Sequence, residues 1–154
     1  MKLTIVEPGP ARETYLPLLM LADDSEQQVR SYLQNGILFV AQLDGNDVGA
    51  TLAIPTELDT IELRAVAVDP RRQHQGVGKQ MLALVLADLN DRGYARTTVG
   101  TGNSSINQIA FYQKAGFRMW TIERDHFTTE KGYSDGLAEN GIPLRDMIWF
   151  ERTN

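Results

Sequence analysis

The chain has 154 residues, and its content of 42% hydrophobic and 23% charged residues is ordinary for a water-soluble globular protein. The formal net charge of −5 weighs against nucleic-acid binding and suits a cationic substrate such as an amine, while the absence of cysteine excludes disulfides, thiolate zinc sites and a cysteine nucleophile. No apolar run approaches the roughly 20 residues that span a bilayer, and residues 1–7 lack the apolar core of a signal peptide, so we expect a cytoplasmic protein without membrane contact.

The first part of the sequence predicts strands and two helices. Residues 3–6 alternate and favour a strand, and apolar residues recur at helical spacing over residues 10–22. Ser25, followed three residues later by Gln28, predicts the N-cap of a second helix, which Asn35-Gly36 ends. Further strands are expected at residues 37–43, 48–54 and 61–68, with a hairpin turn at residues 44–47.

The second part predicts a strand–helix–strand unit followed by another helix and two strands. A broad apolar face predicts a helix over residues 76–90, and the short strand expected at residues 95–99 should run parallel to the strand at 61–68. Ser105 and Gln108 are typical of a capping box that opens a helix at residues 106–115, which Gly116 ends. The last strands are expected at residues 117–122 and 147–150, and residues 124–143 between them show no clear period, which is typical of functional or mobile loops.

The predicted order is β-α-α-β-β-β-α-β-α-β-β, an α/β layout with a mixed sheet that is antiparallel in its first half. No internal repeat, low-complexity tract or linker interrupts it. We therefore expect one domain over residues 1–154.

Residues 68–79 predict an anion site. A β-branched strand stops at Pro70, and a basic turn with two glycines leads into a helix, so that backbone N–H groups and a helix N-terminus converge on one point. Gln73 and Gln80 stand where a Walker loop needs Gly and Ser or Thr, and Met81 stands where a dinucleotide fingerprint needs its third glycine. What remains is the motif Gln73-x-x-Gly76-x-Gly78 with Lys79 after it.

This motif resembles the acyl-CoA pyrophosphate loop of the GNAT N-acetyltransferase superfamily. A second block, Asn107-x-x-x-Phe111-Tyr112-x-x-x-Gly116-Phe117, is similar to the end of that family's cofactor site, and the predicted order of elements is also the family's. The resemblance covers nearly the whole chain. It implies a GNAT-like three-layer fold with a mixed sheet of about seven strands and four helices, and acetyl-CoA as co-substrate. Asp125-His126-Phe127 and the residues that follow resemble the ending of a bacterial subgroup of small GNAT proteins, which names no acceptor.

The resemblance also implies where the co-substrate binds. The loop amides and Lys79 would hold the pyrophosphate, and Arg71 and Arg72 could add charge or simply be solvated. The strand at residues 65–68 would part from the strand at 95–99, and its free backbone would pair with the pantetheine arm. The cofactor-binding residues implied in this way are Val66, Ala67, Val68, Gln73, His74, Gln75, Gly76, Val77, Gly78, Lys79, Asn107, Phe111 and Tyr112, with no metal site.

Two residues are implied in proton transfer. A lysine-like amine with a pKa of about 10.4 is neutral in only about one molecule in 10³ near pH 7.4, so a base acting through a water helps to remove its proton. The resemblance implies Glu62 as this base, and the alternative is a carboxylate paired with Arg64 on the same strand face. The Tyr112 phenol would protonate the leaving thiolate, and the alternative is a tyrosine that only packs beside Phe111. His126, Tyr133, Asp135 and Glu139 are weaker candidates for the acceptor site.

The leading interpretation is an acetyl-CoA-dependent N-acetyltransferase that moves the acetyl group to a primary amine of a small molecule or protein by direct attack in a ternary complex. The alternative is a non-catalytic acyl-CoA-binding sensor or regulatory module of the same fold. A binder of nucleotide phosphates is disfavoured by the missing Walker and dinucleotide residues. The terminal strands could also form a homodimer.

Overall fold

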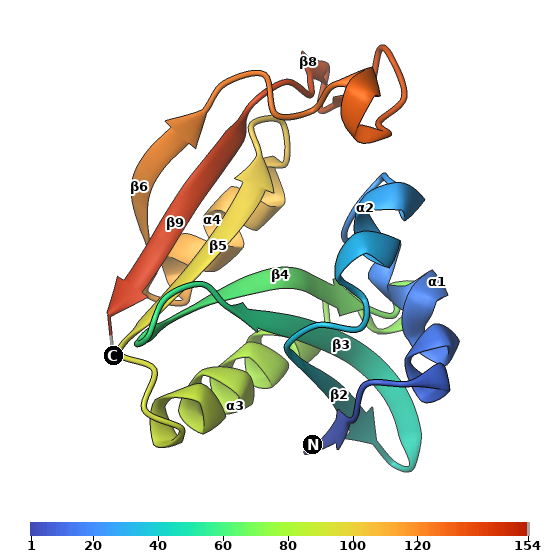
Figure 1. Ribbon diagram of the computed structural model, residues 1–154, viewed down its shortest axis with the longest axis vertical. Helices are drawn as coiled ribbons and strands as arrows, with labels where there is room; N and C mark the ends of the chain where they lie inside the picture. The colour runs from blue at the N-terminus through green and yellow to red at the C-terminus, as the bar shows by residue number, and fades with distance from the viewer. Residues whose placement is uncertain (154) are drawn as a thin grey trace.

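Seven strands form one mixed sheet in the order β1-β2-β3-β4-β5-β9-β6 in the computed structural model of the protein, which describes residues 1–153 (Figure 1). The first four strands pair antiparallel, each with the next, whereas β4 and β5 are parallel and β9 lies antiparallel between β5 and β6. The predicted mixed sheet is confirmed. Its strands are β1 (Lys2–Val6), β2 (Ile37–Leu43), β3 (Asn46–Pro55), β4 (Thr60–Val68), β5 (Arg96–Gly102), β6 (Arg118–Glu123) and β9 (Met147–Thr153).

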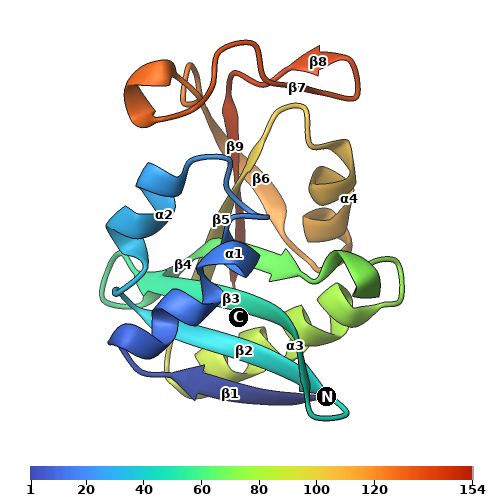
Figure 2. The same cartoon turned by 90° about the vertical axis from the view of Figure 1, so that its right-hand side faces the viewer.

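The helices cover both faces of the sheet, which gives the three layers expected. The short helices α1 (Leu16–Leu19) and α2 (Glu26–Tyr32) lie on one face, and α3 (Val77–Asp91) and α4 (Ile106–Lys114) lie on the other (Figure 2). Each face has its own apolar cluster, the first built around Leu19, Val29 and Leu52 and the second around Met81, Val85 and Phe150. No helix among residues 1–153 is long and apolar enough to cross a membrane.

Strand β2 shows why the sheet is buried on both sides. Leu38 and Val40 belong to the cluster under α1 and α2, whereas Phe39 and Ala41 belong to the cluster under α3. Successive residues of a strand point to opposite faces, and both faces of β2 are covered. All four side chains are therefore fully buried. A strand covered on both faces reads as a continuous apolar run rather than as an alternation.

The single helix predicted over residues 10–22 is wrong in detail. Residues Pro10–Tyr15 form a 3₁₀ helix (η1), and the α-helix begins again at Leu16. Pro17 has no N–H to continue an α-helix from the preceding turn, and it is tolerated in the first turn of a new one. Arg12 in η1 is 1% exposed and donates hydrogen bonds to the carbonyl oxygens of Val6, Leu33, Asn35 and Gly36.

One predicted cap is confirmed and the other is wrong. The Ser25 hydroxyl accepts a hydrogen bond from the Gln28 N–H at 3.2 Å and so caps α2. Ser105 instead donates its hydroxyl to a Glu139 carboxylate oxygen at 2.9 Å, and Gln108 accepts from the Thr101 hydroxyl at 2.7 Å. The N-cap residue of α4 therefore makes no side-chain cap hydrogen bond, and the predicted capping box is wrong.

Residues 124–143, which show no period in the sequence, are folded over the end of the sheet next to α2 (Figures 1 and 2). They contain a 3₁₀ turn, η3 (Thr129–Lys131), and a small antiparallel ladder of β7 (Ala138–Glu139) and β8 (Ile142–Pro143). The carbonyl oxygen of Lys131 accepts hydrogen bonds from the Ser25 hydroxyl and the Gln28 side-chain amide, both at 3.2 Å. These two hydrogen bonds tie residues 124–143 to the start of α2.

Candidate active site

The site begins where β4 and β5 separate. Their parallel pairing joins residues 60–63 to residues 96–99 and ends at Leu63 and Val99. Beyond that point the two strands diverge, as Figure 1 shows. Val66, Ala67 and Val68 all lie past the last pair, so the edge of β4 that faces the gap has no strand partner there. Residues 96–99 of β5 stay paired with β4, so the strand at 65–68 does not part from residues 95–99 as the resemblance implied. The divergence of β5 begins at Gly100.

A cavity of about 510 Å³ lies beside this divergence. Its wall combines residues from β4, from the C-terminal half of β5, from the connection between α1 and α2, and from residues 124–147. Its lining includes the aromatic rings of Tyr32, Phe127, Tyr133 and Trp149, the carboxylates of Asp23, Asp24, Glu62 and Glu139, and the basic side chains of Arg64 and His126, beside aliphatic and uncharged polar residues. Such a wall suits a molecule with both apolar and cationic parts.

The loop before α3 presents free backbone donors. His74 and Gly76 both have positive φ, 62° and 78°, and Gly76 is the N-cap of α3. Within residues 1–153, the amides of residues 75–79 donate to no protein acceptor. A Cβ at Gly78 would lie 3.3 Å from a methyl carbon of Val68 and 3.6 Å from the Phe111 ring, so the helix packs closely against the strand. These exposed amides at a helix N-terminus fit a diphosphate.

The side chains of this loop mostly bond within it. The Gln73 side-chain amide donates to the Val68 carbonyl at 3.3 Å, and the Gln75 amide donates to the Arg71 carbonyl at 3.2 Å. Arg71 pairs with Asp69 at 2.8 Å, and hydrogen bonding to Arg71 lowers the pKa of Asp69 to about 2. Arg72 is half-buried, whereas Lys79 is exposed on the first turn of α3. Lys79 is therefore better placed than Arg71 to meet an anion.

Helix α4 places its predicted residues in different surroundings. Asn107 is exposed in the first turn, and Phe111 is half-buried beside the loop before α3. Tyr112 is buried, with its ring 5.2 Å from Phe111, 5.7 Å from Phe117 and 6.1 Å from Phe150. Burial raises the pKa of Tyr112, so its phenol stays protonated at neutral pH. Within residues 1–153 this hydroxyl has no hydrogen-bond partner.

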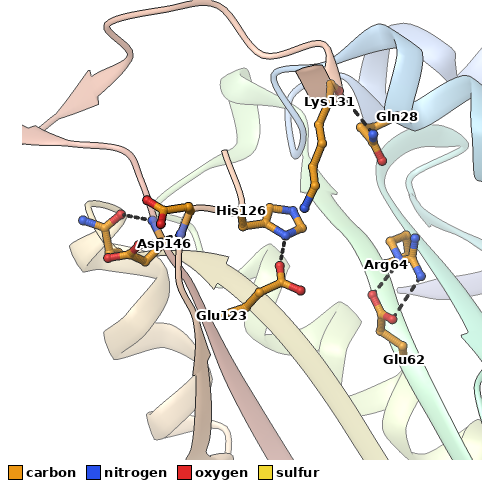
Figure 3. A network of polar contacts seen from close by, with 9 residues as sticks. Gln28, Glu62, Arg64, Glu123, His126, Lys131 and Asp146 are labelled. Carbon is orange, nitrogen blue, oxygen red and sulfur yellow. Dashed lines mark hydrogen bonds and ion pairs between the residues drawn. The ribbon is translucent and has the colours of Figure 1, made fainter. Parts of the chain in front are cut away.

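Glu62 lies in the cavity wall but is already paired, as Figure 3 shows. Its two carboxylate oxygens accept hydrogen bonds from Arg64 at 2.5 Å and 3.1 Å. The Glu62 side chain is 9% exposed and that of Arg64 is 37% exposed. The Arg64 guanidinium also stacks over the Tyr32 ring, 5.3 Å from its centre. The ion pair weighed as an alternative from the sequence is thus present in the structure.

Several residues of the site gave little or no signal in the sequence. The Asn103 side-chain oxygen accepts hydrogen bonds from the N–H groups of Arg145 and Asp146 at 2.8 Å and 3.0 Å, which anchors the returning chain. Asp23 accepts a hydrogen bond from the Tyr32 hydroxyl at 3.2 Å. His126 contacts Glu123, three residues before it. Only Glu123 and His126 are close enough in the sequence for their contact to be expected from it. Asp135, which the sequence suggested for the acceptor site, is not in the cavity wall.

Comparison with known proteins agrees with this geometry. The profile described as "Acetyltransferase (GNAT) domain" matches residues 34–119, which include β4, the loop and both helices α3 and α4. The chain belongs to the GNAT acetyltransferase family. It is 37% identical over 131 residues to the "Uncharacterized N-acetyltransferase YvbK" of Bacillus subtilis (strain 168), which covers 85% of this chain and 83% of that protein.

Two solved structures of GNAT enzymes are similar to this one over nearly its whole length. A Bacillus subtilis acetyltransferase in complex with CoA matches with a TM-score of 0.89 and 32% identity, covering 99% of this chain and 98% of the other. A GNAT family acetyltransferase from Elizabethkingia anophelis with acetyl-CoA bound matches with a TM-score of 0.87 and 32% identity, covering 99% and 97%. This GNAT protein is accordingly an N-acetyltransferase, and the two similar structures hold CoA and acetyl-CoA.

Proposed function

We propose that this GNAT enzyme transfers the acetyl group of acetyl-CoA to a primary amine of a small molecule or a protein by direct attack within a ternary complex. The observation that carries the proposal is the cavity beside the divergence of β4 and β5. An acceptor in this cavity lies next to the free edge of β4, where the acyl arm would be held. The two reactants can then meet without a covalent intermediate on the protein.

The reaction needs two proton transfers. The lone pair of the amine nitrogen attacks the thioester carbonyl carbon, the carbon–sulfur bond breaks, and the sulfur leaves with the bonding electron pair. The nitrogen loses a proton and the sulfur gains one. Since the chain contains no cysteine, a cysteinyl intermediate is excluded.

The loop and β4 would hold acetyl-CoA. The free amides of residues 75–79, together with His74 and Gln73, surround the proposed diphosphate position, and the α3 dipole favours negative charge there. The pantetheine arm would pair with the backbone of Val66, Ala67 and Val68, as an added strand does. Asn107 and Phe111, on the adjacent face of α4, would contact the arm. Acetyl-CoA supplies the activated acyl group, and these residues supply its position.

Tyr112 and Glu62 are the proposed proton donor and acceptor. The raised pKa of the Tyr112 phenol keeps its proton available for the departing thiolate. For Glu62 the support is its place in the cavity wall, and the bonds from Arg64 occupy one lone pair on each of its oxygens. A water could use a remaining lone pair. Replacement of Glu62 by Gln tests this role.

The proposed acceptor is cationic before it reacts. Asp23, Asp24 and Glu139 line the cavity, and the only basic side chains in its wall are Arg64, which is paired, and His126. A homodimer through the terminal strands remains a prediction. In its favour, β6 is an edge strand whose Met119, Trp120 and Ile122 are each more than half exposed.

Release of free CoA from acetyl-CoA, measured with a panel of primary amines, tests the proposal. The panel should contain diamines, polyamines, basic amino acids and peptides with a free N-terminus. We expect amine-dependent CoA release with at least one class and an acetylated product by mass spectrometry. Calorimetric binding of acetyl-CoA without CoA release on any amine would favour the sensor alternative, and no binding at millimolar concentration would contradict both.

A further inference from the structure

His126 occupies a place in the cavity that the proposed mechanism has not used. It follows β6, its side chain is 18% exposed, and it lines the cavity together with residues of β4 and β5. Its ring is held in an aromatic cluster, 4.9 Å from the Phe127 ring and 6.2 Å from the Tyr133 ring. In Figure 3 the ring extends from the side of β6 and β9 toward the space in front of Glu62 and Arg64.

The contact with Glu123 defines the chemistry of this ring. Nδ1 of His126 lies against a carboxylate oxygen of Glu123, within hydrogen-bonding reach. A carboxylate accepts hydrogen bonds, so the neutral imidazole keeps its proton on Nδ1 and leaves the lone pair on Nε2. The same carboxylate stabilises the imidazolium once Nε2 has taken a proton. A carboxylate that orients a histidine in this way is the arrangement used for general-base histidines.

Several other titratable groups of the cavity already have hydrogen-bond partners or keep their own protons. Glu62 is bonded to Arg64 through both oxygens. Tyr32 and Tyr133 have pKa values raised mainly by burial, so their phenols stay protonated. Asp23 accepts a hydrogen bond from the Tyr32 hydroxyl. Nε2 of His126, by contrast, has no hydrogen-bond partner within residues 1–153.

Charged groups from several elements face the His126 ring. Glu123 on β6 is in direct contact with it. Asp23 and Asp24 before α2 and Glu139 on β7 line the same cavity. The side chain of Lys131 on η3 points toward the ring in Figure 3, and the Glu62–Arg64 pair on β4 is neutral as a unit.

We propose that His126, oriented by Glu123, is the general base that takes the proton from the acceptor amine, with Nε2 as the accepting atom. The inference rests on the proposed acetyl transfer and assigns the role of proton acceptor to His126 in place of Glu62. The acceptor ammonium gives one proton to the Nε2 lone pair, which frees the nitrogen lone pair for attack, and the imidazolium returns that proton to solvent after the product departs. The second proton leaves the nitrogen after attack and balances the proton that the departing sulfur gains. Glu62 and Arg64 then form a fixed, neutral part of the cavity wall.

Kinetics test the role of His126 on whichever amine of the panel the wild-type enzyme acetylates. His126→Gln should lower kcat/KM for the amine by about 10²-fold, leave the KM for acetyl-CoA within about twofold, and abolish the fall in rate on the acidic side of the pH profile. Added imidazole should restore part of the rate. Glu123→Gln should move the acidic limb to lower pH, because the imidazolium loses its counter-charge. The matched control is Glu130→Gln, an exposed carboxylate of the same segment, which should leave the rate unchanged.

If the fall in rate on the acidic side of the wild-type pH profile persists unchanged in His126→Gln, the proposal is overturned, while the acetyltransferase function stays intact. If that limb disappears in Glu62→Gln instead, Glu62 is the base. If the wild-type enzyme acetylates no amine of the panel, the result counts against the proposed function and not against His126 alone.

A second measurement needs no acceptor. The chain has two histidines, His74 and His126, so long-range proton–nitrogen NMR spectra of the wild type and of His74→Gln assign both rings. We expect the neutral His126 ring with its proton on Nδ1, and a mixture of tautomers in Glu123→Ala. A wild-type ring with its proton on Nε2, or no change in Glu123→Ala, would overturn the arrangement.

Discussion

The carboxylate of Glu62 accepts two hydrogen bonds from the guanidinium of Arg64, two residues further along the same strand, at 2.5 Å and 3.1 Å. Residues two apart on a strand share a face, so the sequence already places them together. The Glu62 side chain is 9% exposed, and a carboxylate this well buried depends on its partner.

Arg64→Leu should lower the free energy of unfolding by about 2 kcal/mol, because it leaves a buried carboxylate unpaired. This is less than the 3–5 kcal/mol typical of a fully buried pair, since the Arg64 side chain is 37% exposed. Urea denaturation measures the change. Adding Glu62→Gln to Arg64→Leu should recover most of the loss. In the control Arg30→Leu, which breaks the half-exposed pair with Glu13, the change should stay within about 1 kcal/mol.

Gly76→Ala should weaken CoA binding roughly tenfold, which corresponds to about 1.4 kcal/mol. Gly76 caps α3 with a φ of +78°, and a side chain in this left-handed region costs about 1–2 kcal/mol, which the loop relieves by moving its amides. Isothermal titration calorimetry measures the affinity. Gly45→Ala is the matched control, because its φ is +80° and a Cβ at either glycine meets open space. It should cost similar stability and leave CoA affinity unchanged, and equal affinity losses in both variants would contradict the role of the loop.

Tyr112→Phe should lower kcat by about 10²-fold while CoA still binds, because the phenol that would protonate the thiolate is removed and the ring packing is kept. Since burial raises the pKa of Tyr112, its loss should not alter the alkaline side of the pH profile in the mildly alkaline range. Steady-state kinetics and calorimetry check both points. Tyr15→Phe, which removes a hydroxyl bonded to Asp47 at an exposed site, serves as control. Full turnover in Tyr112→Phe would remove the residue from the mechanism.

Asp24→Asn should raise the melting temperature near neutral pH and weaken the binding of a cationic acceptor. Burial, and then the charges of Asp23 and Glu139, raise the pKa of Asp24 above its ordinary value of 3.8, so the folded protein binds this proton more readily than the unfolded chain does. The ionised carboxyl therefore destabilises the fold fully above its folded-state pKa. The penalty declines as the pH falls toward 3.8 and is absent below it. Thermal scans across this range should show the two proteins converging at low pH, and a constant difference would rule out Asp24 as the cause.

Local sequence signals predicted those parts of the fold whose partners are close in the chain. The strand at residues 37–43 has the bounds expected, and α3 begins and ends within one residue of its prediction. The Ser25 cap also needs only residues of its own turn. The capping box at Ser105 failed: its hydroxyl donates to Glu139, 34 residues away, and caps no N–H group of α4. A local rule cannot include a competitor that arrives through the tertiary fold.

The sequence by itself determined that a glycine-bearing loop with the features of a diphosphate site precedes a helix, because glycines, a strand end and a helix N-terminus within a dozen residues fix their own geometry. Only the tertiary structure decided how residues 124–147 meet the start of α2 and the divergence of β4 and β5, and so which side chains face the acceptor cavity. The contacts that hold this segment, such as those of Lys131 with Ser25 and Gln28, span more than a hundred residues and have no periodic signature in the sequence. Chemistry that depends on them, including the orientation of His126 toward the cavity, can therefore be inferred only once the chain has folded.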